Sequence, residues 1–168
     1  MLVPGIRERN DTDVAECVKT LAQVHAAGGY PSNWPVDPAR WLSPSGMYRA
    51  WVCPSDDLGV AGHLLVTRVR GAWPGVTDSH GRAEVGCLFV SPSARGRGVA
   101  SRLLQQAVLW AGRCRRDLVL EVADHLKTGI ALYERMGWRQ TETVLSDWAG
   151  PDGRRIPLRR YELCYDQT

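Results

Sequence analysis

The sequence of 168 residues lacks the long apolar run that a membrane helix requires. No stretch approaches the roughly 18 apolar residues that span a bilayer, and residues 1–5 lack the basic-then-apolar pattern of a signal peptide. Metal-ligand spacing is missing too, because the cysteines stand singly, without a CxxC pair or a histidine partner. They are Cys17, Cys53, Cys87, Cys114 and Cys164. We therefore expect a cytoplasmic protein without membrane association or bound metal, whose cysteines are buried free thiols.

Lysine is also scarce, because Lys19 and Lys127 are the only lysines among 21 basic residues. Arginine carries the rest of that charge, a bias for which a GC-rich genome is the simplest explanation. Arginine also suits bidentate contacts with phosphate, so the bias is compatible with an anionic cofactor. The net charge of +3 is too small to indicate nucleic-acid binding, and no aromatic stacking pattern accompanies the arginines of residues 113–116 and 154–160. We expect those arginines to be solvated, and we expect no nucleic-acid partner.

The remaining composition is that of an ordinary folded protein, with 44% hydrophobic and 23% charged residues. The length suffices for one hydrophobic core, so we expect a single domain over residues 1–168. Strands are predicted at residues 6–9, 47–53, 60–69, 83–90, 118–122, 138–146 and 156–165, and helices at residues 14–28, 38–42, 99–113 and 130–136. This order predicts an α/β protein whose strands and helices share one mixed sheet.

Turn and capping residues mark where these elements end. Acidic and amide side chains at residues 10–13 can cap the first helix, and the glycines at residues 28–29 can end it. Asp37 followed by Pro38 predicts the start of the second helix. Prolines and glycines predict connections at residues 54–57, 70–81 and 150–153.

The stretch most informative about function joins a strand to the most regular of these helices. Between the strand that ends at Val90 and the body of the helix lie Arg95, Gly96, Arg97, Gly98, Val99, Ala100 and Ser101. The two glycines have no Cβ, so a bulky anion can approach the backbone and meet the free N–H groups of the first helical turn. Those amides and the positive end of the helix dipole favour phosphate, and the two arginines add charge beside them. The alternative is a plain tight turn before a helix.

Two other phosphate-binding motifs do not fit this stretch. A dinucleotide-binding fold needs a third glycine and a turn directly after the strand, whereas Ser101 takes the place of that glycine and several residues intervene. A P-loop needs Gly-Lys-Ser/Thr, which the sequence lacks.

At these residues the chain resembles the GNAT superfamily of N-acetyltransferases, whose fingerprint is Gln/Arg-x-x-Gly-x-Gly/Ala. Residues 95–100 match it, and the order of elements is similar to that of the family across nearly the whole chain. The resemblance implies a central mixed, mostly antiparallel sheet of about seven strands flanked by about four helices. It also implies that the loop binds the pyrophosphate of coenzyme A, while Leu88, Phe89 and Val90 pair their backbone with the pantetheine arm.

A second segment, residues 130–138, looks like the Leu-Tyr-x-x-x-Gly-Phe/Trp signature of the same family. The resemblance implies that Tyr133 lies near the cofactor sulfur, where its phenol could protonate the departing thiolate. The alternative is a core tyrosine whose hydroxyl is satisfied locally. Leu126 stands where the family often has an asparagine, so Asp124, His125 or Thr128 is expected to replace that cofactor contact.

A base is also required, because an amine must be neutral to attack a thioester while a free alkylamine has a pKa near 10. Glu84, at the start of the strand before the loop, is the candidate, since some family members carry a base there and burial would raise its pKa. The alternative is an ordinary carboxylate at the end of a strand. Backbone N–H groups near Val90 are expected to polarise the thioester carbonyl.

The resemblance places the acceptor between the loop after the first helix and the connection between the last two strands. The expected contacts are His25, Tyr30, Trp34, Asp147 and Trp148. Aromatic rings with one carboxylate could hold a cationic amine, whereas the alternative is that the tryptophans simply pack the loops onto the sheet.

Together these features predict an enzyme that moves an acetyl group from acetyl-CoA to a primary amine of a small molecule, amino acid or peptide. Direct transfer in a ternary complex is expected, because no Ser-His-Asp arrangement with a nucleophile elbow is present. The alternative is a non-catalytic acyl-CoA-binding sensor. A homodimer is plausible by analogy with the family alone.

Overall fold

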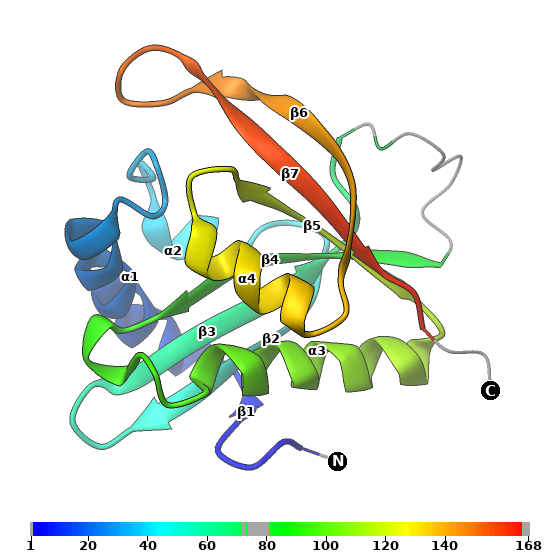
Figure 1. Ribbon diagram of the computed structural model, residues 1–168. Coiled ribbons are helices and arrows are strands. Elements are labelled where there is room, and N and C mark those ends of the chain that lie inside the picture. The colour runs from blue at the N-terminus through cyan, green and yellow to red at the C-terminus, as the bar shows by residue number, and fades with distance from the viewer. Residues whose placement is uncertain (1, 72, 74–80, 166–168) are drawn as a thin grey trace.

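The computed structural model describes residues 2–71, 73 and 81–165, so most of the connection expected at residues 70–81 lies outside the described residues. Seven strands form one sheet in the order β1-β2-β3-β4-β5-β7-β6 (Figure 1). They are β1 (Arg7–Glu8), β2 (Met47–Ser55), β3 (Gly59–Thr67), β4 (Arg82–Val90), β5 (Asp117–Ala123), β6 (Arg139–Ala149) and β7 (Arg155–Leu163). The α-helices of the described chain are α1 (Val14–Gly28), α2 (Pro38–Trp41), α3 (Val99–Cys114) and α4 (Lys127–Arg135).

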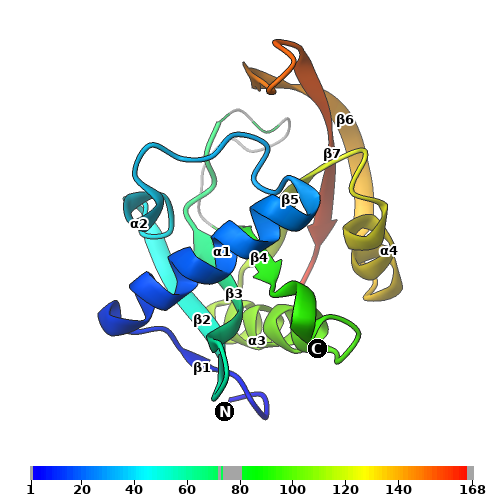
Figure 2. The ribbon, with the colours of Figure 1, turned by 90° about the vertical axis from the view of Figure 1, so that its left-hand side faces the viewer.

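The sheet is mixed and mostly antiparallel, which confirms the predicted fold class. Within the described residues β4 and β5 form the parallel pair, and every other neighbouring pair is antiparallel. The crossover between β4 and β5 contains α3, as a parallel connection requires. The hairpin of β6 and β7 extends beyond the rest of the sheet in both views (Figures 1 and 2).

Helices cover both faces of the sheet (Figure 2). Alternate residues of β3 point to opposite faces, so Leu64 packs with Leu103 of α3 while Leu65 packs with Leu21 of α1. The larger core lies between the sheet, α3 and α4, and the smaller core lies beneath α1. None of the described helices is long and apolar enough to cross a membrane.

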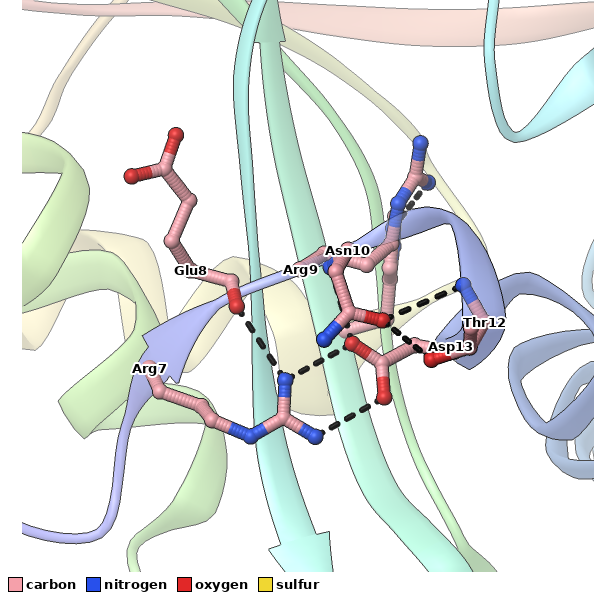
Figure 3. A network of polar contacts seen from close by, with 7 residues as sticks. Arg7, Glu8, Arg9, Asn10, Thr12 and Asp13 are labelled. Atoms are coloured by element: carbon pink, nitrogen blue, oxygen red, sulfur yellow. Dashed lines mark hydrogen bonds and ion pairs between the residues drawn. The ribbon is translucent and has the colours of Figure 1, made fainter.

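The chain enters α1 through a network of polar contacts (Figure 3). Arg7 donates two hydrogen bonds to the carboxylate of Asp13, at 2.7 and 2.8 Å. The same carboxylate accepts a hydrogen bond from the backbone N–H of Asn10, whose side chain in turn accepts from the N–H of Thr12. The residues predicted at 10–13 form a capping box on the 3-10 turn Asp11–Asp13 that leads into α1, whereas Asp13, the N-cap of α1 itself, makes no side-chain cap.

The predicted ends of the other elements are largely confirmed. Gly29 ends α1 with a φ of +70°, and the Asp37 side chain caps α2 by accepting from the N–H of Arg40. The connection expected at residues 54–57 is confirmed at residues 56–57 only, because β2 continues through Pro54 and Ser55. Proline fits there because β1 pairs with β2 only near Trp51, which leaves this end of β2 without a partner on its outer edge.

The expectation that all cysteines are buried is also wrong. Cys17, Cys53 and Cys87 are buried free thiols, whereas Cys114 and Cys164 are exposed. The two exposed residues lie at the last residue of α3 and just after β7, where the chain leaves the core.

Gly62 of β3 marks the closest approach of α3 to the sheet. A Cβ at this position would lie 2.7 Å from Val99 Cγ1 and 3.2 Å from the Phe89 carbonyl oxygen. We predict that Gly62→Ala lowers the free energy of unfolding by about 1–3 kcal/mol through overpacking. Gly112→Ala in α3, where nothing lies within 4 Å, should raise it by about 0.5–1 kcal/mol. Urea unfolding followed by tryptophan fluorescence measures both, and an equal effect of the two substitutions would contradict the close approach.

Candidate functional site

The site begins where two parallel strands part. β4 pairs with β5 only from Arg82 to Glu84, and the remainder of β4, residues 85–90, has no partner on that side among the described residues. The backbone edge of Leu88 and Val90 is therefore open at the fork, as a strand-like ligand would require. Phe89 turns its ring into the core beneath α1.

A β-bulge lies on the open part of β4. Leu65 pairs with Gly86 and His63 with Phe89, so the two residues Cys87 and Leu88 oppose the single residue between His63 and Leu65. Cys87 has a φ of +50°, which is uncommon for a residue with a side chain. The sequence prediction missed this bulge, although the isolated Gly86 inside a strand pattern is a known signal for one.

His63 supports the bulge from the neighbouring strand. Its Nε2 lies 2.9 Å from Nη1 of Arg9, which can only donate, so Nδ1 carries the proton and donates to the Cys87 carbonyl at 2.8 Å. The imidazole is fully buried and stacked on Phe89 with ring centroids 5.2 Å apart. Burial lowers the pKa of His63 to about 3, so the ring stays neutral.

The glycine loop leads from the fork into α3. Gly96 and Gly98 have φ values of +74° and +72°, and open space lies where their Cβ atoms would be. The first backbone hydrogen bond into the helix runs from Arg102 N to Gly98 O at 3.1 Å, so the amides of Val99, Ala100 and Ser101 have no acceptor among the described residues.

The charged side chains of this loop face solvent. Arg95 and Arg97 are exposed, and Arg102 on the first turn of α3, which the sequence prediction missed, reaches back to the carbonyl oxygens of Arg97 and Gly98. Val99 turns its side chain into the core, so its amide alone is available to a ligand. Free amides, a helix N-terminus and arginines together suit a phosphate.

Tyr133 on α4 combines features of the two predicted alternatives, a core tyrosine and a proton donor. Its ring is buried and packs against Trp138 and Tyr161, with centroids 6.0 and 6.1 Å away. Its hydroxyl has no hydrogen-bond partner within the described part of the chain, unlike that of Tyr161, which donates to Glu134 at 2.8 Å. Burial raises the pKa of Tyr133 well above 10, so the phenol keeps its proton.

The residues near Leu126 offer little replacement for the missing asparagine. Leu126 is the N-cap of α4 and makes no side-chain cap. Asp124 forms ion pairs with Arg159 at 2.5 Å and with Lys127 at 3.5 Å, so its carboxylate is already engaged.

Glu84 sits at the point where the strands part. Its side chain is only 11% exposed, and its Oε2 accepts a hydrogen bond from the backbone N–H of Arg70 at 2.9 Å. Burial raises the pKa of the carboxyl, against the lowering effect of that hydrogen bond and of the Arg70 charge. Thr67 on β3 pairs with Glu84, and its buried hydroxyl has no partner among the described residues.

The five residues expected at the acceptor fall into two groups. His25 and Trp34 have ring centroids 5.4 Å apart, and Tyr30 makes an edge contact with Trp41. Asp147 and Trp148 lie near the end of β6, and not in the connection between β6 and β7 where they were expected. β6 is longer than predicted because it continues past a register shift to Ala149.

The two groups are joined by one contact. The Asn33 side chain donates to the Ala149 carbonyl at 2.7 Å, so the loop after α1 touches the β6–β7 hairpin. Within the described residues no hydrogen bond, ion pair or ring contact links Asp147 or Trp148 to the aromatic rings of that loop, and both side chains are exposed.

The described residues contain no group of three or more His, Cys, Asp or Glu side chains that could hold a metal ion. The polar groups present at the site are the donors of backbone amides, arginines and a phenol, and one buried carboxyl group that accepts. They suit an anionic, extended ligand that lies next to the carboxyl of Glu84, which can take up a proton.

Comparison with known proteins finds acetyltransferases by sequence and by structure. The model of the acetyltransferase (GNAT) family matches residues 22–138. An uncharacterized N-acetyltransferase of Methanocaldococcus jannaschii is 30% identical over 117 residues, which cover 63% of this chain and 47% of that protein. The chain thus spans about half the length of this relative.

Solved structures share the fold over nearly the whole chain. A GCN5-related N-acetyltransferase from Kribbella flavida has a TM-score of 0.70 and 26% identity, covering 95% of this chain and 96% of its own. A GNAT superfamily phosphinothricin acetyltransferase from Sinorhizobium meliloti, in complex with acetyl-CoA, has a TM-score of 0.75 and 16% identity, covering 97% and 89%.

The buried neutral His63 predicts a specific dependence of stability on pH. In the unfolded chain an imidazole binds a proton near pH 6.5, whereas in the folded state it does so only at about 3. The stability that the neutral imidazole of His63 contributes is therefore complete above pH 6.5 and is lost as the pH falls toward 3. Over this range the free energy of unfolding falls by up to about 1.4 kcal/mol per pH unit. His63→Gln keeps a donor and an acceptor but cannot titrate, so its free energy of unfolding should fall less steeply between pH 6.5 and 4.

Chemical unfolding at several pH values measures the slopes. His125→Gln, which changes an exposed imidazole, is the matched control and should keep the slope of the wild type. Equal slopes for the wild type and His63→Gln would overturn the neutral, buried assignment of His63.

Proposed function

The chain belongs to the acetyltransferase (GNAT) family, and from that premise we propose that it transfers an acetyl group from acetyl-CoA to a primary amine. The observation that supports this most is the fork between β4 and β5, with an open strand edge that leads to free amides at the start of α3. A thioester carrier has an extended arm and a diphosphate, and the fork offers a surface for each.

In this proposal the donor lies along β4. The backbone of Leu88, Phe89 and Val90 pairs with the amide groups of the pantetheine arm. The diphosphate is held by the turn at residues 95–101, through backbone amides and the charges of Arg95 and Arg97. Gly96 and Gly98 have no Cβ to occupy the space that the phosphates need, and their positive φ is a conformation that favours glycine.

The transfer itself is direct. The amine nitrogen attacks the thioester carbonyl carbon, a proton passes from the amine to Glu84, and the C–S bond breaks as Tyr133 protonates the departing sulfur. Backbone N–H groups near Val90 polarise the carbonyl. Solvent returns a proton to the Tyr133 oxygen and takes one from Glu84, so the enzyme is restored after each turnover.

The acceptor reaches Glu84 from the side of α1 and the β6–β7 hairpin. The side chains of His25, Tyr30 and Trp34 form one wall in this proposal, and Asp147 and Trp148 on the exposed end of β6 form the other. Such a wall suits a small amine, because its aromatic rings can contact the ammonium group by cation–π interaction.

A non-catalytic acyl-CoA sensor is the alternative function. The buried phenol of Tyr133, whose hydroxyl is not used by its described neighbours, favours the enzyme. A sensor would need the phosphate turn but would have no use for a proton donor and a buried carboxylate at the fork.

Two measurements test the function together. The wild type should bind coenzyme A in a calorimetric titration and release thiol from acetyl-CoA when primary amines are present. Gly98→Ala should weaken binding of coenzyme A by about tenfold, because a methyl group and a strained left-handed residue enter the phosphate turn. Gly153→Ala, also at positive φ with open space around it, is the matched control and should bind like the wild type. Binding without thiol release in a broad panel of amines would favour the sensor.

The pH dependence of turnover tests the two catalytic assignments. For the wild type, kcat/KM should fall at acidic pH as Glu84 becomes protonated, at a pKa raised by burial. Glu84→Gln should lose about 10²-fold near pH 7 and recover as the pH approaches the amine pKa of about 10. Tyr133→Phe should lower kcat about 10²–10⁴-fold at every pH, since the phenol does not ionise in this range.

The control for Tyr133→Phe uses another tyrosine, away from the fork. Tyr48→Phe, whose ring lies under Arg116 at 4.8 Å, should leave kcat unchanged. A Tyr133→Phe enzyme with the turnover of the wild type over the whole pH range would remove the proton-donor role.

A further inference from the structure

Arg70 is an arginine near the fork that makes one long ion pair, with Glu84, within the described residues. Its backbone N–H holds Glu84, and its guanidinium Nε lies 3.9 Å from Glu84 Oε2, beyond hydrogen-bond distance. The guanidinium has no hydrogen-bond acceptor among the described residues, and its side chain is 57% exposed. One of its Nη atoms lies 3.9 Å from the place that a Cβ on Gly86 would occupy, so the guanidinium of Arg70 lies next to the bulged part of β4.

The surroundings of Arg70 are the acceptor side of the site. Its charge opposes the effect of burial on the pKa of Glu84, of Cys87 at the bulge and of Tyr30 in the loop after α1. Two segments that the sequence separates, β4 and the loop after α1, therefore lie in the field of one cationic group. A positive charge at this place disfavours an acceptor that carries only ammonium groups.

A second arginine on the same sheet shows what a structural arginine looks like in this protein. Arg160 of β7 donates to Glu121 and Glu142, both at 2.8 Å, and its guanidinium stacks over Trp73 at 4.4 Å. Two carboxylates and a ring thus satisfy Arg160. Arg70 has only the long ion pair with Glu84 among the described residues, and a planar guanidinium without a hydrogen-bonded carboxylate is suited to bind one from a ligand.

We propose that Arg70 binds the carboxylate of a free α-amino acid, whose amine then lies at Glu84 and receives the acetyl group. This inference rests on the proposed function and names its acceptor class. The amine and carboxylate of an α-amino acid sit on one carbon, with their heavy atoms about 3 Å apart by standard bond lengths. That spacing is about 1 Å shorter than the 3.9 Å between Arg70 Nε and Glu84 Oε2, so the two ligand groups can lie alongside the two protein groups.

Other amines match this pair of groups less well. The N-terminus of a peptide presents a neutral amide next to its amine, which leaves Arg70 without an anion. A diamine brings a second cation toward the guanidinium, and like charges at this distance repel. An ω-amino acid holds its carboxylate several bonds away from the amine, so it cannot meet both groups at once.

The test compares each amino acid with the amine that lacks only its carboxylate. Leucine is paired with 3-methylbutylamine, phenylalanine with phenethylamine and arginine with agmatine, and N-acetylated product is measured by mass spectrometry with acetyl-CoA as donor. The wild type should prefer the amino acid of at least one pair by about tenfold or more in kcat/KM, the difference expected from one charge-assisted contact. Arg70→Gln should abolish that preference, chiefly through KM for the amino acid.

Arg68→Gln is the matched control, because Arg68 is an exposed arginine two residues earlier in the same segment. It should keep the preference of the wild type. A general loss of folding would change both members of a pair alike, so the ratio within each pair separates recognition of the carboxylate from stability. Acetylation of the amines that equals or exceeds that of their amino acids, or an undiminished preference in Arg70→Gln, would overturn the proposal.

Binding measurements keep this inference separate from the transfer reaction. If no amine of either class is acetylated, the proposed transfer is wrong, and the Arg70 proposal is then decided by calorimetric titration of the protein saturated with coenzyme A. Tighter binding of an amino acid than of its paired amine, lost in Arg70→Gln, would support it. Absence of binding for every amino acid of the panel would overturn it.

Discussion

Beyond Glu84, β4 and β5 part, and the rest of the site follows from this separation. The bulge at Cys87 and Leu88 adds one residue to β4 opposite β3, and such an insertion bends the strand and increases its twist. β4 therefore stays bonded to β3 while its other edge turns away from β5. A strand edge in the middle of a sheet is thus left open, next to the start of α3, without exposing the core on either face.

Keeping a bulge with a positive φ in place requires contacts that are far apart in sequence. The Cys87 carbonyl is held by His63, His63 is held by Arg9, and Arg9 also donates to the Leu42 carbonyl at 2.5 Å. The chain of bonds runs from Arg9, just after β1, through β3 to β4 and to the end of α2. The imidazole of His63 stays neutral because burial lowers its pKa, and a second positive charge beside Arg9 would be costly.

The sequence predicts α3 and the turn before it well because both depend on local patterns. The apolar period of residues 99–113 fixes α3, and the glycines at 96 and 98 fix the turn before it, so the free amides follow from residues within one short segment. The resemblance at residues 95–100 and 130–138 then supplied the family, which the comparisons confirm. The predicted roles of Tyr133 and Glu84 remain proposals.

The surroundings of Glu84 and the end of β6 depend on contacts between distant segments, which the sequence does not show. Nothing in the local pattern of Arg70 distinguishes it from Arg68, and its position becomes informative only because its N–H reaches Glu84, fourteen residues later. Asp147 and Trp148 were expected in a loop because Gly150 and Pro151 follow them, yet pairing with β7 extends β6 to Ala149. A turn signal limits where a strand can end, but the partner strand decides where it does end.

The electrostatic balance of the open half of the sheet also comes from distant pairs. Arg160 is offset by Glu121 and Glu142, which join β7 to its two neighbouring strands. Those charges are mutually satisfied, whereas the carboxyl of Glu84 and the guanidinium of Arg70 share only a long ion pair within the described residues. One is buried enough for its pKa to rise, and the other is exposed enough to remain charged and accessible. A site with that pair is complementary to a ligand that carries both an amine and an anion.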